Sequence, residues 1–327
     1  MQADYKKKLI EKLKIKYPPK DRWEMRDAMF EDLAGRPLWD RDKTLIQSAL
    51  IENGYDDIAA KMSSCSAAKR CRSPYCDYCQ RDLFDGQKER FKKFLLKPFK
   101  SDEAKARKNL FFVTVLHELI PFDQPDSDIL RFPMEKIKSA LASARAKLKA
   151  VRRSYKDQIK FVGAFELEAV NGLLVNLHPV KGQVLAEMNG TKIKLSDKFI
   201  LVHSHFIVDL SKIKPSPNLE KEPVDLFREK LREIWTSTRQ VDVSRLYENK
   251  PVSQSLSRLA DYPLKFPIKY YYRFNGIAAD NEIIVKGKKQ NLARNHEPAV
   301  MAEMITGVYE IGLNALFIRM GLTKASK

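Results

Sequence analysis

Two histidines and two glutamates occur at spacings that place each pair on one face of a β-strand. His203 and His205 flank a serine in an apolar run, and successive residues of a strand point to opposite faces, so both imidazoles share a face. Glu166 and Glu168 alternate in the same way in a second apolar run. If the two strands are neighbours, a carboxylate completes a His-His-Glu set that suits Mg²⁺ or Mn²⁺ in phosphoryl chemistry. Taken separately, each pair also fits satisfied polar residues of a half-buried strand.

The four cysteines of the chain lie close together, at the spacing C-x5-C-x4-C-x2-C: Cys65, Cys71, Cys76 and Cys79. The last two can hold two tetrahedral thiolate positions from one tight turn, which is typical of a Zn²⁺ site. Four protein ligands leave no open coordination position, so the expected zinc is structural. Four ordinary reduced cysteines are the alternative interpretation. Disulfides spread through a secreted fold are not expected from so compact a cluster.

Tyr262 stands in the segment D-Y-P-L-K, three residues before Lys265. A tyrosine that attacks a phosphodiester forms a phosphotyrosyl bond, which retains the energy of the broken bond and allows a strand to be rejoined without ATP. The role expected of Lys265 is to lower the pKa of the phenol or to hold a phosphate. A single tyrosine is more often a packing residue, so Tyr262 is a candidate nucleophile only in combination with the other motifs.

The chain is strongly basic. Its 327 residues include 60 Lys and Arg against 42 Asp and Glu, which leaves a formal charge of +18. Nucleic acid is the expected partner, because a basic surface gains affinity by releasing counterions from phosphates. A cluster on one predicted helix is expected to contact it: Lys147, Lys149, Arg152 and Arg153. An anionic membrane surface and a merely solvated basic face are the alternatives.

No apolar run reaches the ~20 residues that a membrane span requires, and the start of the chain lacks the apolar stretch of a secretory signal. We therefore expect a cytoplasmic protein that does not associate with membranes.

The elements that position these groups alternate between strands and helices. Runs of β-branched and aromatic residues predict strands over 110–116, 159–170 and 198–210. Apolar residues at helical spacing predict helices over 134–158, 224–239 and 296–322. The pattern indicates an α+β fold with a central, mostly antiparallel sheet and helices packed on one face.

In this order the motifs resemble those of the rolling-circle replication initiators of bacterial and archaeal plasmids, which belong to the HUH endonuclease superfamily. The matching segments are 70–79, 111–115, 163–168, 203–206, and 239–243 followed by 262–265. The resemblance implies a sheet with the histidine strand at its centre and the tyrosine on a following helix. It also implies a Mg²⁺- or Mn²⁺-dependent nick at an origin, with a covalent 5'-phosphotyrosine and a free 3'-OH for a polymerase.

The resemblance assigns a role to each candidate. Tyr262 would be the nucleophile, and His203 and His205 would be metal ligands. Glu168 is preferred as the third ligand because it better fits the family's acidic position, with Glu166 as the fallback. The implied partners are single-stranded or hairpin origin DNA together with a host helicase and polymerase.

The chain departs from the family pattern at two positions. Family members often read H-P-H-F-H, and Ile207 stands where the third histidine would be. Some members carry a glutamate four residues before the tyrosine, where this chain has Arg258. A second nucleophile among residues 270–272 is one interpretation of the three tyrosines there, and a buried strand is the other. A transposase or relaxase of the superfamily, or a non-catalytic zinc-containing DNA-binding regulator, remains an alternative function.

These motifs divide the chain into four expected regions. Residues 1–60 form a helical N-terminal region, and residues 61–108 form the cysteine module with a basic helix. Residues 109–275 correspond to the endonuclease domain that the resemblance implies. Residues 276–327 are expected to be a C-terminal helical extension.

Overall fold

The structure of the protein is a computed structural model. It describes residues 46–65, 69–71, 73, 76–100, 102–126, 129–172, 179–191, 193–194, 196–214, 221–235, 237, 239–246, 248–261, 269–274, 290–295 and 297–321. Tyr262 and Lys265 lie outside these residues, as does most of the predicted N-terminal region.

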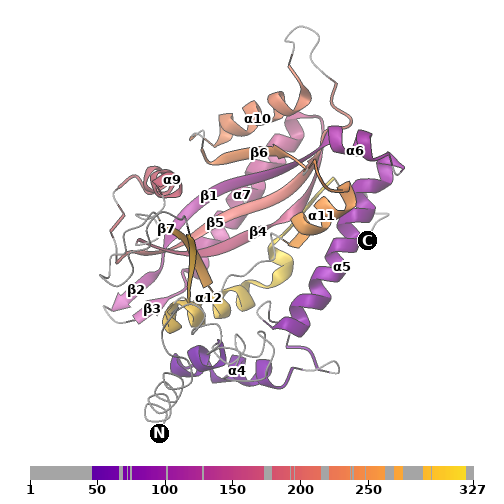
Figure 1. The fold of residues 1–327 in the computed structure, drawn as a ribbon. Helices are drawn as coiled ribbons and strands as arrows, with labels where there is room; N and C mark the ends of the chain where they lie inside the picture. Colours follow the sequence, from indigo (N-terminus) through magenta and orange to yellow (C-terminus); the bar gives the residue numbers. More distant parts are fainter. Residues whose placement is uncertain are drawn as a thin grey trace.

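Five strands form the main sheet, in the order β6-β1-β5-β4-β9, and each neighbouring pair is antiparallel (Figure 1). The strands are β1 (Leu110–Pro121), β4 (Lys160–Asn171), β5 (Lys198–Asp209), β6 (Val241–Arg245) and β9 (Phe317–Met320). The three long strands are those predicted from the β-branched and aromatic runs, and the α+β class with an antiparallel sheet is confirmed. β5, the histidine strand, lies at the centre between β1 and β4.

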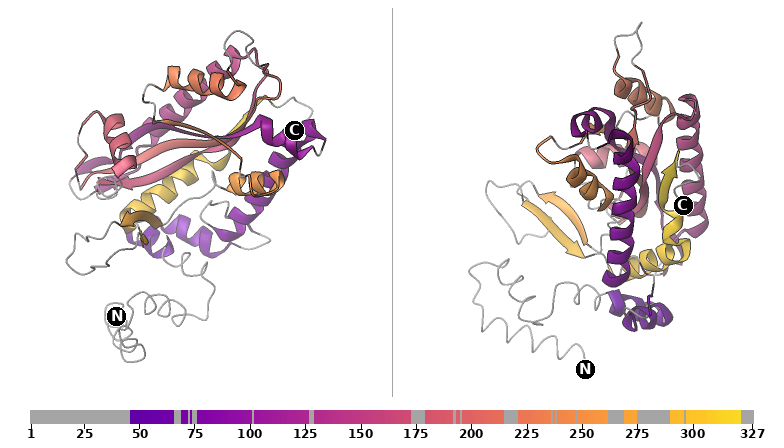
Figure 2. Two further views of the ribbon diagram at one scale, coloured as in Figure 1. Left: turned by 45° about the horizontal axis from the view of Figure 1, so that its top comes forward. Right: turned by 90° about the vertical axis from the view of Figure 1, so that its right-hand side faces the viewer.

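Helices cover both faces of the sheet, so the prediction of helices on one face was wrong. One face packs against α7 (Met134–Ser154), α10 (Pro223–Ile234) and α12 (Pro298–Ile311). The other packs against α5 (Asp77–Leu96) and α11 (Val252–Asp261) at one end and α9 (Pro179–Asn189) at the other. Figure 2 shows α5 and α7 on opposite sides of the sheet. The cause is visible in β5, which is buried at every residue after Lys198 and therefore needs cover on both faces.

The C-terminal part of the chain belongs to the sheet and is only partly helical. The helix predicted over 296–322 ends at Ile311, and Gly312 follows with φ of 76°, a conformation that glycine adopts without a Cβ penalty. After the short helix η3 (Leu313–Ala315), β9 pairs with β4 and buries Phe317 and Ile318. The segment that sequence reasoning assigned to a C-terminal extension thus supplies an outer strand of the sheet.

The remaining elements surround this core. Residues 46–52 and α4 (Asp56–Ser63) are helical and include the described part of the region 1–60. The short helix η1 (Lys97–Phe99) and α6 (Glu103–Asn109) connect α5 to β1. Two small sheets pair β2 (Asp123–Asp126) with β3 (Ile129–Arg131) and β7 (Lys269–Phe274) with β8 (Gln290–Asn295). The three tyrosines at 270–272 therefore lie in a strand. Among the described helices, none combines the length and apolar character needed to cross a bilayer.

A buried carboxylate ties the N-terminal helices to α12 and to β3. Glu303 of α12 is 4% exposed and accepts hydrogen bonds from the Tyr55 hydroxyl, the Arg131 guanidinium and the Phe132 backbone N–H. Burial, reinforced by Glu303, raises the pKa of Tyr55 to about 12, so the phenol stays protonated and donates. The network satisfies a charge that would otherwise be costly to bury.

Gly163 permits the close contact of β4 with the histidine strand. A Cβ at this position would overlap the carbonyl oxygen of His205 and the Cα of Phe206, which are backbone atoms that side-chain rotation cannot move. We expect Gly163→Ala to destabilise the protein by about 1–3 kcal/mol in urea unfolding. Gly86→Ala is the matched control, because its Cβ would meet nothing within 4 Å and the helix α5 should gain slightly. Equal stability of the two variants would contradict the packing described here.

Candidate metal centres

The pairing of β4 with β5 gathers three metal-ligating side chains on one face of the sheet. Glu166 lies opposite His203 in the strand register, and Ala164 lies opposite His205. The Glu166 Oε2 atom is 3.2 Å from His205 Nε2 and 3.6 Å from His203 Nε2. One donor atom from each of these three buried residues lies within 4.8 Å of the other two. Ligands that share one octahedral ion at about 2.1 Å stand about 3–4 Å apart, so the group can hold a metal ion.

The carboxylate of this group belongs to Glu166, which the sequence placed second to Glu168 as the third metal ligand. Glu168 pairs with Leu201, farther along the strand, and its Oε2 is 3.8 Å from His203 Nε2. Its side chain is 22% exposed, compared with 8% for Glu166. Glu166 therefore faces both imidazoles, whereas Glu168 stands beside the group on its more exposed side.

β1 supplies a second layer of contacts that sequence reasoning missed. Thr114 lies opposite His205, and its Oγ1 is 3.0 Å from His205 Nδ1. The Phe112 ring is parallel to the His205 ring within 3°, at a centroid distance of 5.7 Å. A partner on one ring nitrogen orients the other toward a metal, so Thr114 directs Nε2 to Glu166. The only sequence signal was a polar residue at an alternating position within an apolar strand.

His117 supports the histidine strand from the opposite face. The β1–β5 register shifts between Leu116 and Glu118, and His117 at this bulge points into the core, where its Nε2 is 2.8 Å from Ser204 Oγ. Burial, with a contribution from the nearby Lys147 charge, lowers the pKa of His117 to about 3, so the ring is neutral at physiological pH. Ser204, between the two metal-facing histidines, is thereby held by a hydrogen bond.

Ile207, at the position where the resemblance led us to expect a third histidine, has a packing role. It lies two residues beyond His205 on the same face and joins an apolar cluster with Val162 of β4 and with Val252 and Leu256 of α11. His203 and His205, the two histidines present in this motif, are those that meet Glu166. Through Val252 and Leu256, helix α11 packs on the face that carries the histidines, and it ends at Asp261, directly before Tyr262.

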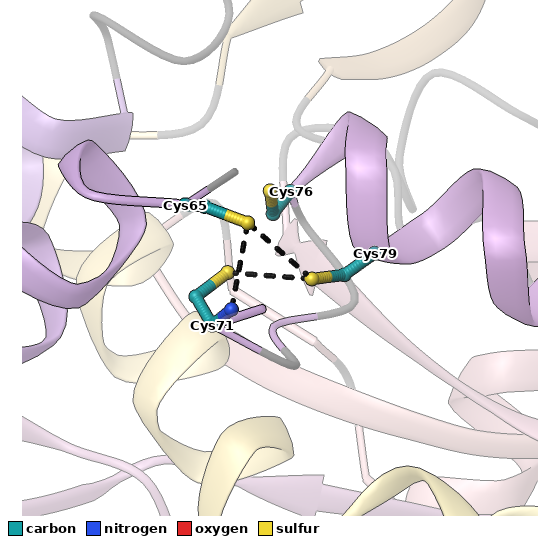
Figure 3. Close-up of side chains that lie close together, drawn as sticks. All are labelled: Cys65, Cys71, Cys76 and Cys79. Atoms are coloured by element: carbon teal, nitrogen blue, oxygen red, sulfur yellow. Dashed lines mark hydrogen bonds between the residues drawn. The ribbon is translucent and has the colours of Figure 1, made fainter. Parts of the chain in front are cut away.

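The four cysteines converge as predicted. Figure 3 shows their sulfur atoms directed toward one another, with Cys76 and Cys79 at the start of α5. Cys79 Sγ is 3.6 Å from both Cys65 Sγ and Cys71 Sγ, and all four sulfurs lie within 4.8 Å of one another. Tetrahedral ligands at the Zn–S distance of about 2.3 Å are separated by about 3.8 Å, so the cluster can hold a metal ion of this kind.

The surroundings of the sulfurs fit a cation. All four cysteines are buried, and the Cys71 backbone N–H donates to Cys65 Sγ. The hydrogen bond with Cys76, followed by burial, raises the pKa of the Cys71 thiol. Thiolates in such a place need a bound metal ion to compensate their charge. Ala302 and Ile305 of α12 complete the apolar cover of the cluster.

The basic cluster predicted on α7 lies on the face of the sheet away from the histidines. Arg152 has a structural task, because it donates to the Ile159 carbonyl and forms an ion pair with Asp157 at 3.0 Å. The Lys147 ammonium is 5.8 Å from the centre of the Trp235 ring. Lys149 and Arg153 are on the same helix. These residues are thus separated from the His-His-Glu group by the sheet itself.

Comparison of the chain with protein-family models, with curated proteins and with solved structures gave no match.

Proposed function

We propose that the protein nicks and rejoins single-stranded DNA by transferring a phosphoryl group to Tyr262, and that it initiates rolling-circle replication in this way. The convergence of Glu166, His203 and His205 on the central strands is the observation that carries this proposal. Two imidazoles and one carboxylate form a mixed nitrogen and oxygen donor set, which takes Mn²⁺ more readily than Mg²⁺. Three protein ligands also leave coordination positions open for a substrate phosphate and water.

A divalent cation held by the three residues would offset the negative charge that develops on the scissile phosphate and the leaving oxygen. Neighbouring side chains orient the ligands of this site. Thr114 orients the His205 ring, and the parallel Phe112 ring packs beside it. A buried site strengthens each electrostatic interaction with the phosphate.

The proposed reaction exchanges one phosphoester bond for another. The Tyr262 oxygen loses its proton and bonds to phosphorus, and the bond from phosphorus to the 3'-oxygen breaks. The 3'-oxygen leaves with a proton as a free hydroxyl, while the 5'-phosphate stays on the tyrosine. Attack of a 3'-hydroxyl on the phosphotyrosine reverses the step and rejoins the strand. Lys265 is assigned to hold the phosphate or to favour the phenolate.

Several features support this assignment. Helix α11 lies on the histidine face and ends one residue before Tyr262. The charge of +18 suits a polyanionic substrate. An antiparallel sheet with the histidines on its central strand agrees with the HUH endonuclease fold, and we propose that the chain has this fold. For the cysteine cluster we propose structural Zn²⁺, because four thiolates close the coordination shell.

A covalent protein–DNA adduct is the test of this function. Purified protein incubated with Mn²⁺ and labelled single-stranded or hairpin oligonucleotides is expected to give a labelled band that survives denaturing electrophoresis. Tyr262→Phe should abolish the band while DNA binding, measured by fluorescence anisotropy, remains. Tyr155→Phe, at the end of α7 on the opposite face of the sheet, is the matched control and should leave the band intact.

Other outcomes identify the alternatives. DNA binding without any adduct would point to a non-catalytic zinc-containing regulator. An adduct that persists in Tyr262→Phe would assign the nucleophile to another residue. An adduct that forms on the ends of a mobile element or on a transfer origin, in preference to a replication origin, would indicate a transposase or a relaxase.

A further inference from the structure

A cavity of about 450 Å³ lies at the junction of α5, η1, α6 and α11. Its lining combines three lysines and four apolar side chains with two carboxylates and a serine. The lining residues are Lys93, Leu96, Lys97, Phe99, Lys100, Asp102, Glu103, Ala106, Val252 and Ser253. These elements meet at one end of the sheet (Figure 1).

The two carboxylates of the lining are already engaged by the protein. Asp102 accepts a hydrogen bond from the Lys105 backbone N–H and caps α6. Glu103 accepts one from the backbone N–H of Val252 at the start of α11. Within the part of the chain that the structure describes, no ion pair joins any of the three lysines to a carboxylate. Three ammonium groups around an apolar pocket suit a ligand that carries both a phosphate and an apolar ring.

The cavity lies on the same side of the sheet as the His-His-Glu group. Phe99 and Val252 belong to the apolar cluster that contains Ile207. Phe112 packs against that cluster and also stacks on His205. Helix α11 begins at the cavity and ends at Asp261, and ten residues of helix span about 15 Å. Through Phe112, the apolar cluster at the cavity is thus connected to the metal centre on the same face of the sheet.

We infer that this cavity binds a nucleotide of the single strand that is cut, with the phosphate near Lys93, Lys97 and Lys100 and the base against Leu96. The inference rests on the proposed function for the identity of the strand. Lysine contacts to phosphate release counterions, and apolar contact accepts any base, so the site anchors the strand without reading its sequence. Lys93 and Lys97 lie one helical turn apart, which allows both to reach the same phosphate.

Anisotropy titrations of a labelled oligo-dT strand, without added divalent metal, test the inference on the full chain. The variant is Lys93→Gln with Lys97→Gln, and the control is Lys136→Gln with Lys138→Gln on α7, which removes the same charge from the opposite face. Each phosphate contact contributes about 0.7 to the slope of log K against log salt for single strands. For the cavity variant we expect the slope of log K against log salt to decrease in magnitude by at least about 0.7. We also expect its affinity for oligo-dT to be about tenfold lower near 0.1 M salt. The control should retain the wild-type slope.

Two results would overturn the inference. Equal losses in the cavity variant and the α7 control would show that only overall charge matters. Displacement of oligo-dT by polyglutamate as effectively as by unlabelled oligo-dT would show that the lysines accept any polyanion. The proposed function would fail by a different result, the absence of the covalent adduct in wild-type protein. That result would leave the comparison of slopes unchanged.

Discussion

Glu166→Gln is expected to lower the affinity of the His-His-Glu group for Mn²⁺ by about 100-fold or more, whereas Glu168→Gln lowers it by less than about tenfold. The reason is geometric, because Glu166 Oε2 is within 3.6 Å of both imidazole Nε2 atoms, while Glu168 approaches only that of His203. An amide keeps the size of the side chain but removes the negative charge that a cation needs. Calorimetric titration with Mn²⁺ measures the effect directly.

The covalent adduct provides a second readout of the same pair. Its yield should fall with the Mn²⁺ affinity in Glu166→Gln and recover in part at high Mn²⁺ concentration. Glu168→Gln is the matched control, since it carries the same change two residues away on the same face. A larger loss in Glu168→Gln than in Glu166→Gln would restore Glu168 as the third ligand, as the family resemblance implied.

Cys79→Ser is expected to abolish zinc binding and to destabilise the protein by more than about 4 kcal/mol. Cys79 Sγ contacts the sulfurs of both Cys65 and Cys71, so its loss removes the shared ligand of the cluster. The buried remaining thiols would then have no common cation. Zinc content by mass spectrometry and urea unfolding measure the two effects.

A neighbouring serine provides the control. Ser64→Ala, next to Cys65, removes only an exposed hydroxyl that donates to the Lys61 carbonyl and should change neither zinc content nor stability appreciably. Removal of zinc from the wild-type protein by a chelator should reproduce the instability of Cys79→Ser. Wild-type protein that contains no metal and is as stable as the variant would support four ordinary reduced cysteines.

The sequence predicted the parts of the site that depend on local periodicity. Period-two alternation placed His203 with His205, and Glu166 with Glu168, on common faces before any strand pairing was known. The choice between the two glutamates depends on the register of β4 against β5, which is set by pairing between segments far apart in the chain. Both glutamates fit the alternation equally well, so composition and spacing contained no information on the choice.

Tertiary contacts account for the features that the sequence analysis missed. Helices on both faces follow from the burial of β5 on both sides. The strand β9 in place of a longer helix follows from Gly312, which ends α12, and from pairing with the edge of β4. His117 points into the core because of a bulge, and bulges leave little trace in an apolar pattern. The cysteine cluster was predictable because its four ligands lie near one another in the chain.

The arrangement of α12 and β9 also constrains how the chain folds as it is synthesised. β4 exposes a strand edge until residues 317–320 are available to pair with it. The cysteine cluster is translated before Ala302 and Ile305 of α12, which cover it. Nascent chains therefore carry an open edge between the synthesis of β4 and that of β9, and an uncovered thiol cluster until α12 is made, and in these intervals aggregation and oxidation compete with folding.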